Sequence, residues 1–138
     1  MKDIEIAVKE LEKGKSIVFV KNGRILFEDK AKGIRPILKA LNEKGLEGSS
    51  AADTVVGLAH AMISAEIPVK EVYGKVLSKS AKDFLEKKKI PFTYDILVDR
   101  ILNKKEDDLC PMEKRAQESQ DTKELVEKIE TFFQEMRK

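Results

Sequence analysis

The fold is decided by residues 71–98, EVYGKVLSKSAKDFLEKKKIPFTYDILV. The first seven of these residues have the composition of a β-strand, and residues 78–80 then offer caps for a helix over residues 81–88. A second strand is expected at residues 91–98. Strand, helix and strand in this order predict a right-handed crossover and a parallel strand pair, which indicates the α/β class.

Upstream of this unit, an antiparallel hairpin is expected to begin the sheet. Two β-rich runs, residues 16–20 and 24–28, are joined by Lys21-Asn22-Gly23, and Asn-Gly favours the positive φ angles of a tight turn. An amphipathic helix over residues 4–11 precedes the hairpin. We therefore predict a three-layer α-β-α arrangement, in which helices cover a mixed sheet that starts with an antiparallel hairpin.

Two more helices are expected between the hairpin and the crossover unit. Residues 33–44 carry apolar side chains at helical spacing, with Pro36 acceptable only near the first turn. Residues 51–67 are rich in small and apolar side chains and end before Pro68. That run predicts a buried central helix.

The C-terminal part is less regular. Residues 99–113 contain an exposed charged stretch, and the polar residues 114–122 indicate a linker or a frayed turn. A helix is expected from about residue 121, with one apolar side formed by Leu125, Ile129, Phe132, Phe133 and Met136. The chain of 138 residues is expected to form one domain, since domains usually hold about 100–200 residues.

Composition argues against several classes of function. The 27 basic and 25 acidic residues are evenly mixed, whereas a dedicated nucleic-acid binder shows a clustered basic face. No apolar run reaches the roughly 18 residues of a membrane helix, and the charged start lacks a secretion signal. A single cysteine suits a reducing compartment. We expect a cytoplasmic protein without a nucleic-acid or membrane partner.

Three segments carry a resemblance to a known family: residues 50–57, residues 72–78, and Cys110-Pro111-Met112-Glu113. Together they resemble an uncharacterised family of small prokaryotic proteins of unknown function, placed in the cytidine-deaminase-like fold. The resemblance spans roughly residues 15–113 and is moderately specific only when the three segments are combined. It implies that fold, with a site at the opening of the helix expected from residue 51.

Deaminases hold a zinc-activated water with one ligand and a proton-shuttling Glu opening one helix, and with Pro-Cys-x-x-Cys opening the next. If Asp53 takes the place of that Glu, the ligand position becomes Ala51, and the next helix opens with residues 78–81, which include no Cys. The chain has one Cys and one His, while zinc sites use three or four ligands. We expect no zinc and no cofactor, and a carboxylate site for magnesium or manganese stays open.

Asp53 is the first candidate catalytic residue, because the first turn of the expected central helix would present its carboxylate as a base. The alternative is a purely structural acid that favours the helix dipole. Ser49 and Ser50, beside free backbone N–H groups at the same helix opening, are candidates for binding an anion or phosphate. His60 lies about 10 Å further along this helix, too far for a direct pair with Asp53. It indicates a packing residue, and its titration range leaves a weak acid-base role as the alternative.

Cys110 and Glu113 are the other candidate catalytic residues. Cys110 is a potential nucleophile, although neighbouring acidic residues oppose a thiolate and a buried small side chain is the alternative. Pro111 suits the first turn of a short helix that also contains Glu113. If this segment folds back over the central helix, Cys110 and Glu113 lie near Asp53.

The remaining ligand-binding candidates lie on the crossover unit. Lys75 and Lys79 offer positive charge for a phosphorylated ligand, and Ser78 lies between them. The alternative is that these lysines are solvated surface residues.

Three functional hypotheses remain. The first is a metal-free module that binds a nucleotide or a nucleotide-derived ligand. The second is a hydrolase or transferase of a nucleotide-like substrate, with Asp53 as base and Cys110 or Glu113 as partner. The third is a scaffold that forms homo-oligomers through the apolar side of the last helix.

Overall fold

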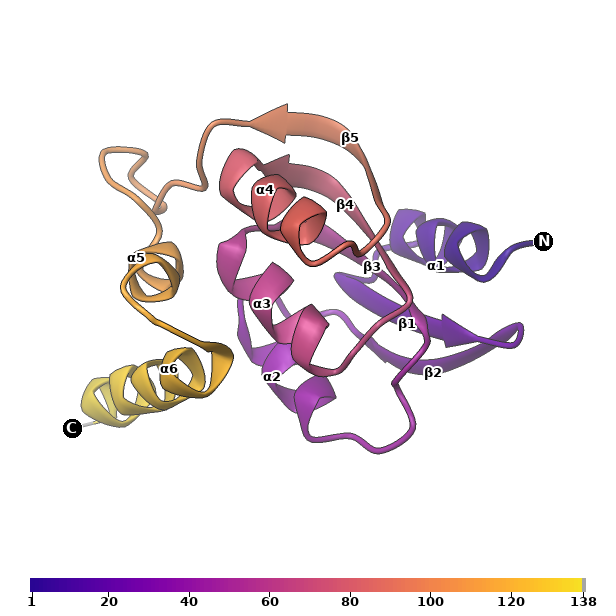
Figure 1. Ribbon diagram of the computed structural model, residues 1–138, viewed down its shortest axis with the longest axis horizontal. Helices are drawn as coiled ribbons and strands as arrows, with labels where there is room; N and C mark the ends of the chain where they lie inside the picture. Colours follow the sequence, from indigo (N-terminus) through magenta and orange to yellow (C-terminus); the bar gives the residue numbers. More distant parts are fainter. Residues whose placement is uncertain (138) are drawn as a thin grey trace.

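The computed structural model describes residues 1–137, and a five-stranded mixed sheet forms its centre (Figure 1). The strand order is β2-β1-β3-β4-β5. β1 is antiparallel to both of its neighbours, whereas β3, β4 and β5 are parallel to one another. The predicted α/β class and mixed sheet are confirmed. The strands are β1 (Ile17–Lys21), β2 (Arg24–Asp29), β3 (Ser50–Val56), β4 (Glu71–Ser78) and β5 (Phe92–Val98).

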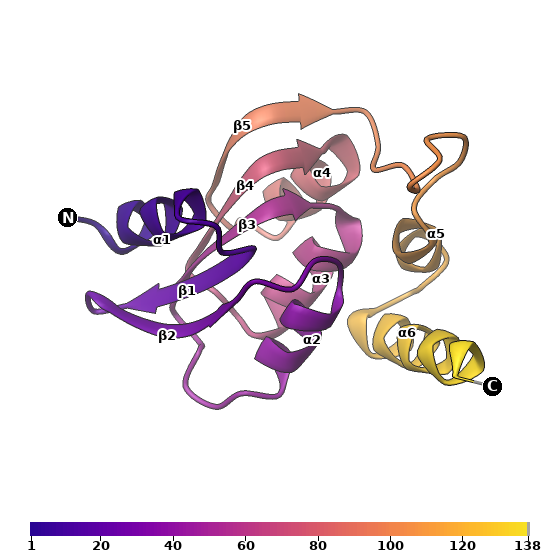
Figure 2. The same ribbon diagram turned by 180° about the vertical axis from the view of Figure 1, so that it is seen from behind.

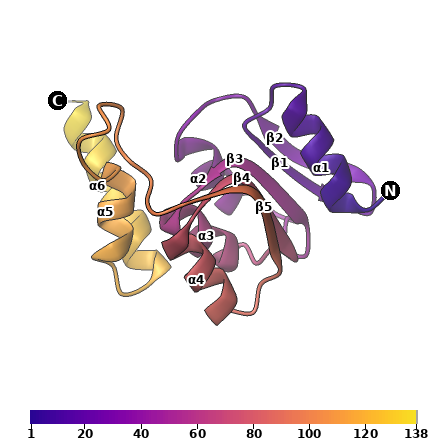
Figure 3. The same cartoon turned by 90° about the horizontal axis from the view of Figure 1, so that it is seen from above.

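Helices cover both faces of this sheet. α1 packs on one face, α2, α3 and α4 lie on the other, and α5 and α6 lie outside α3 (Figure 3). Within residues 1–137, no helix is both long and apolar enough to cross a membrane. The helices are α1 (Asp3–Glu12), α2 (Arg35–Leu41), α3 (Leu58–Glu66), α4 (Lys79–Lys87), α5 (Pro111–Gln117) and α6 (Thr122–Met136).

The hairpin follows from its turn residues. Asn22 and Gly23 have φ angles of 53° and 77°, as a two-residue hairpin turn requires. The N–H groups of Asn22 and Gly23 both donate to the Asp3 carboxylate, at 2.9 and 2.8 Å. The first helix is thereby tied to the tip of the hairpin.

Two apolar cores form because both faces of the central strands are buried. The larger core lies between the sheet and the helices, where Phe19 of β1 and Leu77 of β4 meet Ile63 of α3. The smaller core lies under α1, where Val18 of β1 and Tyr73 of β4 belong to one cluster with Ala7 of α1. Alternate residues of one strand therefore enter different cores.

The predicted helix over residues 51–67 is wrong in its first half. Ser50–Val56 forms β3, and α3 begins only at Leu58, after Gly57. β3 pairs with β1 on one side and β4 on the other, and both of its faces are largely covered. A strand that is buried on both faces lacks the alternation of apolar and polar residues. Periodicity therefore does not distinguish it from a buried helix.

Two smaller differences concern the other helices. α2 covers only Arg35–Leu41 of the predicted residues 33–44. α5 forms over Pro111–Gln117, part of which was predicted as a linker. Its buried side consists only of Glu113 and Ala116, so the apolar periodicity that marks a helix is nearly absent.

The apolar side of α6 packs mainly on its own chain. Leu125 and Ile129 are fully buried in the larger core. The guanidinium carbon of Arg35 lies 3.9 Å from the centre of the Phe133 ring, and that of Arg115 lies 4.2 Å from the Phe132 ring. Much of the surface on which the oligomer hypothesis rests is therefore already covered within one chain.

Candidate functional site

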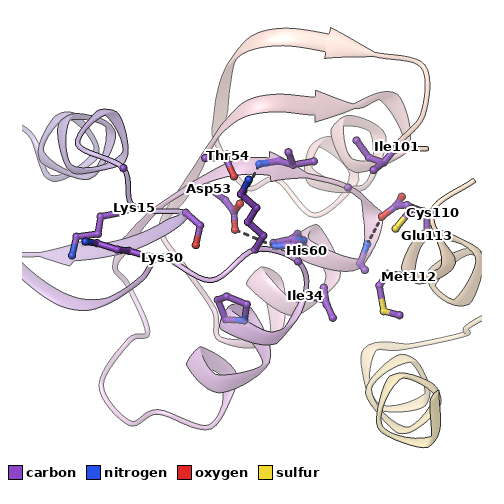
Figure 4. Close-up of a pocket in the computed structure, with 18 residues that line it drawn as sticks. Lys15, Lys30, Ile34, Asp53, Thr54, His60, Ile101, Cys110, Met112 and Glu113 are labelled. Atoms are coloured by element: carbon purple, nitrogen blue, oxygen red, sulfur yellow. Dashed lines mark hydrogen bonds and ion pairs between the residues drawn. The ribbon is translucent and has the colours of Figure 1, made fainter. Parts of the chain in front are cut away.

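A cavity of about 500 Å³ opens at the carboxyl edge of the parallel strands (Figure 4). All three parallel strands point toward this edge, and α5 lies beyond it (Figure 2). The start of β1 lies here too, because β1 runs antiparallel to β3 and pairs Ile17 with Asp53. Ligands of α/β proteins commonly bind outside the carboxyl ends of the strands.

Asp53 and His60 meet in this cavity. The chain leaves β3, turns at Gly57 and runs back along the sheet as α3, which brings Nε2 of His60 within 3.0 Å of Oδ2 of Asp53. Their side chains are only 13% and 14% exposed. The other carboxylate oxygen of Asp53 accepts the N–H of Val55 at 3.1 Å. The expected separation of about 10 Å is wrong, since it assumed one continuous helix.

Burial and the nearby carboxylates have opposite effects on the pKa of His60. Burial, the largest single effect, lowers the pKa of His60, but the negative charges of Asp53 and Glu113 together outweigh it and raise that pKa above 6.5. Nε2 is buried and has no directed hydrogen bond to any group in residues 1–137, despite its distance to Asp53. The two side chains are therefore close together, and Nε2 of His60 is left as a polar atom to be satisfied.

Glu113 caps α3 from α5. Its carboxylate is buried and accepts the N–H groups of Leu58 at 2.9 Å and Ala59 at 3.2 Å, the first two residues of α3. The positive end of the helix dipole favours this charge. A Cβ at Gly57 would lie 2.2 Å from Oε1 of Glu113, so the close approach requires glycine there.

Cys110 lines the cavity from the same segment. It is the N-cap residue of α5, half-buried, and followed by Pro111 in the first turn as predicted. The segment folds back onto α3, so Asp53, Cys110 and Glu113 do line one cavity. Their proximity agrees with the sequence prediction, and their catalytic roles stay predictions.

Ser49 and Ser50 lie elsewhere. The Ser49 hydroxyl donates to the Leu46 carbonyl at 2.6 Å, and the Ser50 hydroxyl donates to Glu71 at 2.6 Å. Ser50 begins β3, so it lies at the strand end away from the cavity, whereas Asp53 lies in the middle of the strand. The helix opening expected beside these serines is wrong, because residues 50–56 form a strand.

Lys75, Ser78 and Lys79 are also outside the set that lines the cavity. Lys75 is exposed on β4. The Ser78 hydroxyl accepts the N–H of Ala81 at 3.1 Å and caps α4. Nζ of Lys79 lies 2.7 Å from Asp99. These side chains have structural or surface contacts, and the structure does not bring them to Asp53.

Three other lysines, which the sequence analysis did not single out, line the cavity: Lys15, Lys30 and Lys32. Lys15 precedes β1 and the other two follow β2, so the pairing of β1 with β2 brings them to one side. The predicted hairpin already implied that these lysines lie close together, because the start of its first strand and the end of its second must be neighbours.

The donor set of the cavity does not fit the zinc site of a deaminase. Asp53 and His60 face each other, and both oxygens of Glu113 accept backbone N–H groups. Across residues 1–137, no group of three or more His, Cys, Asp or Glu side chains has the arrangement of a metal site. Zinc sites need three or four such ligands around one point.

Comparison with known proteins gives a family and a solved structure. A family model described as a domain of unknown function (DUF1893) matches residues 6–133, which include all the cavity residues. The crystal structure of a DUF1893 family protein, TM1506 from Thermotoga maritima, is similar, with a TM-score of 0.83 and 27% identity. The similarity covers 95% of this chain and 90% of that chain. No curated protein matches.

Proposed function

The chain belongs to the DUF1893 family of domains of unknown function, and we propose that it binds a small nucleotide-like ligand in the cavity beside α3. The observation that carries this proposal is the contact between Asp53 and His60, which places an imidazole and a carboxylate side by side in a cavity of about 500 Å³. Cavities of roughly 300–1,000 Å³ with few polar groups in apolar walls are typical of small-molecule sites.

The chemistry of the pair suits a heterocyclic base. The imidazole of His60 carries an N–H donor in either protonation state, and the Asp53 carboxylate is an acceptor. A nucleobase carries ring nitrogens, carbonyl oxygens and amino groups at adjacent positions, so one edge of it can engage both side chains. Ile34, Pro36 and Met112 provide apolar walls that favour a planar ring.

We also propose that the fold is cytidine-deaminase-like and that the family has lost the zinc motif. The hairpin that begins the sheet and the helices joining its parallel strands support the fold. Deaminase zinc ligands open successive helices, and here the openings of α2 and α3 present Ile34, Gly57 and Ala59 to the cavity, none of which has a side chain that binds zinc. A cytoplasmic location is part of this proposal and is supported by the single cysteine.

A thermal-shift panel of nucleosides, nucleotides and ADP-ribose derivatives tests the binding function. At a ligand concentration 100 times the dissociation constant, binding stabilises the folded state by about 2.7 kcal/mol. We expect at least one member of the panel to raise the melting temperature, and Asp53→Asn to abolish that rise. Asp83→Asn, on the exposed side of α4, is the matched control and should respond like the wild type. A panel without any hit contradicts the proposal.

An enzyme is the second candidate, favoured by the same 3.0 Å contact. A carboxylate beside an imidazole orients it for proton transfer, so His60 replaces Glu113 as the partner of Asp53 in a hydrolase or transferase. Glu113 is occupied by the N–H groups of α3, while Cys110 stays a candidate nucleophile on the cavity wall. Turnover of a bound nucleotide that His60→Gln abolishes without loss of binding would establish this function.

A further inference from the structure

Basic and acidic side chains lie on different sides of the cavity. Lys15 and Lys30 lie on one side of Asp53, while Glu113 lies on the other (Figure 4), and Lys32 lines the same cavity. Nζ of Lys15 is 3.1 Å from Glu28. None of the ion pairs found within residues 1–137 involves Lys30 or Lys32. Lys30 and Lys32, two residues apart on the segment after β2, therefore offer two exposed ammonium groups to the cavity.

The opposite end excludes an anion. A helix N-terminus is the usual phosphate site of an α/β protein, but the first two N–H groups of α3 already donate to Glu113. The charges of Glu113 and Asp53 also repel a phosphate there. A ligand with one anionic group can place it favourably only at the lysine end, which leaves its uncharged polar end beside Asp53 and His60.

The number of charges limits the anion to a single phosphate. A phosphate monoester carries about −1.5 to −2 charges at pH 7, which two ammonium groups balance. A triphosphate carries more negative charge than Lys30 and Lys32 offer. Mg²⁺ on a nucleotide is usually held by one or two carboxylates, and here Asp53 faces His60 while Glu113 accepts the first N–H groups of α3.

We propose that the ligand is a nucleoside monophosphate, with its phosphate at Lys30 and Lys32 and its base at Asp53 and His60. This inference rests on the proposed nucleotide-binding function and adds the number of phosphates and the orientation. The apolar side chains of Ile34 and Pro36 contact the nucleoside between the two ends.

Isothermal titration calorimetry with the 138-residue chain tests this orientation directly. The probes are AMP, GMP, CMP and UMP, each with its nucleoside and its triphosphate, together with inorganic phosphate and ribose 5-phosphate. We expect one monophosphate to bind at least about tenfold more tightly than its nucleoside, since two charge-assisted contacts are added. Added salt should lower the affinity of the monophosphate and leave the affinity of the nucleoside unchanged.

Variants locate the phosphate. Lys30→Ala combined with Lys32→Ala should reduce the affinity of the monophosphate to that of the nucleoside, without changing nucleoside binding. Lys75→Ala removes an exposed lysine from β4, outside the cavity, and should bind like the wild type. Each single variant is measured as well. If the double variant does not fold, the loss of monophosphate affinity in each single variant and the salt dependence test the phosphate position instead.

The outcomes separate the inference from the proposed function. Equal binding of a nucleoside and its monophosphate overturns the inference and leaves nucleotide-like binding standing. If inorganic phosphate binds with the same affinity as the monophosphate, the base makes no contact and its assignment to Asp53 and His60 is wrong. If the triphosphate binds more tightly than the monophosphate, the assignment of a single phosphate is wrong. An equal loss in Lys75→Ala shows attraction by overall charge and also overturns the inference. No binding of any probe removes the proposed function as well.

Discussion

At the scale of single residues, Gly57 and Glu113 depend on each other. Ala at position 57 would place its Cβ 2.2 Å from Oε1 of Glu113, while the backbone at φ −101° accepts any residue. We expect Gly57→Ala to lower the free energy of unfolding by about 1–3 kcal/mol, because it displaces the cap and leaves a buried carboxylate without donors. Urea denaturation measures this loss.

A double-mutant cycle separates the cap from other effects of the methyl group. In the presence of Glu113→Ala, Gly57→Ala should cost much less, because the carboxylate it displaces is absent. Equal costs in both backgrounds would show that the cap contributes nothing to the effect.

The protonation of His60 makes a second prediction at this scale. His60 is the only histidine of the chain, so its NMR titration is read without assignment. We expect a pKa above 6.5 in the wild type, a fall in Asp53→Asn, and a smaller fall in Glu113→Gln, because Asp53 contributes more to raising this pKa. Asp83→Asn should leave it unchanged. A wild-type pKa below 6.5 would show that burial outweighs the two carboxylates.

The same shift predicts how stability depends on pH. Because the pKa of His60 is raised on folding, protonation stabilises the folded state fully below the unfolded value of 6.5. This stabilisation is lost as the pH rises through the folded pKa. The free energy of unfolding should therefore fall across that range in the wild type relative to His60→Gln, as urea titrations at several pH values can determine. A parallel pH dependence in both proteins contradicts the assignment.

At the scale of elements, local chemistry explains what the sequence could predict. Asn22-Gly23 specifies the hairpin turn, and the strand, helix and strand of residues 71–98 specify the crossover, because each signal lies within a few residues. β3 was missed because its character depends on distant neighbours. Only pairing with β1 and β4 makes residues 50–56 a strand. The turn at Gly48, with a φ angle of 79°, can precede a strand or a helix equally well.

Gly74 tests the packing of β3 against β4. A Cβ at Gly74 would lie 2.9 Å from Cγ2 of Val56, in the well-packed larger core. We expect Gly74→Ala to destabilise the protein by about 1–3 kcal/mol through overpacking, observed as a lower melting temperature. Lys75→Ala, at the next position of β4 and exposed, is the control and should change little. An unchanged melting temperature in Gly74→Ala would mean that the Val56 side chain can move aside without destabilising the protein.

At the scale of the whole molecule, the cavity could not be predicted from the sequence. Its walls come from the start of β1, the end of β2, the junction of β3 with α3, and the start of α5. The Cys110 to Glu113 motif indicated one wall through the resemblance. His60 could be placed beside Asp53 only once residues 50–56 were known to form a strand, because a continuous helix would separate the two by about 10 Å. The hairpin alone brings the three lysines together, but only the strand order shows that they line the same cavity as Asp53.

The integrity of this cavity depends on α6, which holds α5 and hence Cys110 and Glu113 in place. Leu125 of α6 is fully buried in the same core as the sheet residues, so we expect α6 to unfold together with the sheet. Leu125→Ala should cost about 2–5 kcal/mol and keep one cooperative transition by circular dichroism. Glu127→Ala, exposed on the same helix, should cost little. Hydrogen exchange that shows α5 and α6 opening far more readily than β3 and β4 would instead make them a separable cover of the cavity, since such units open independently.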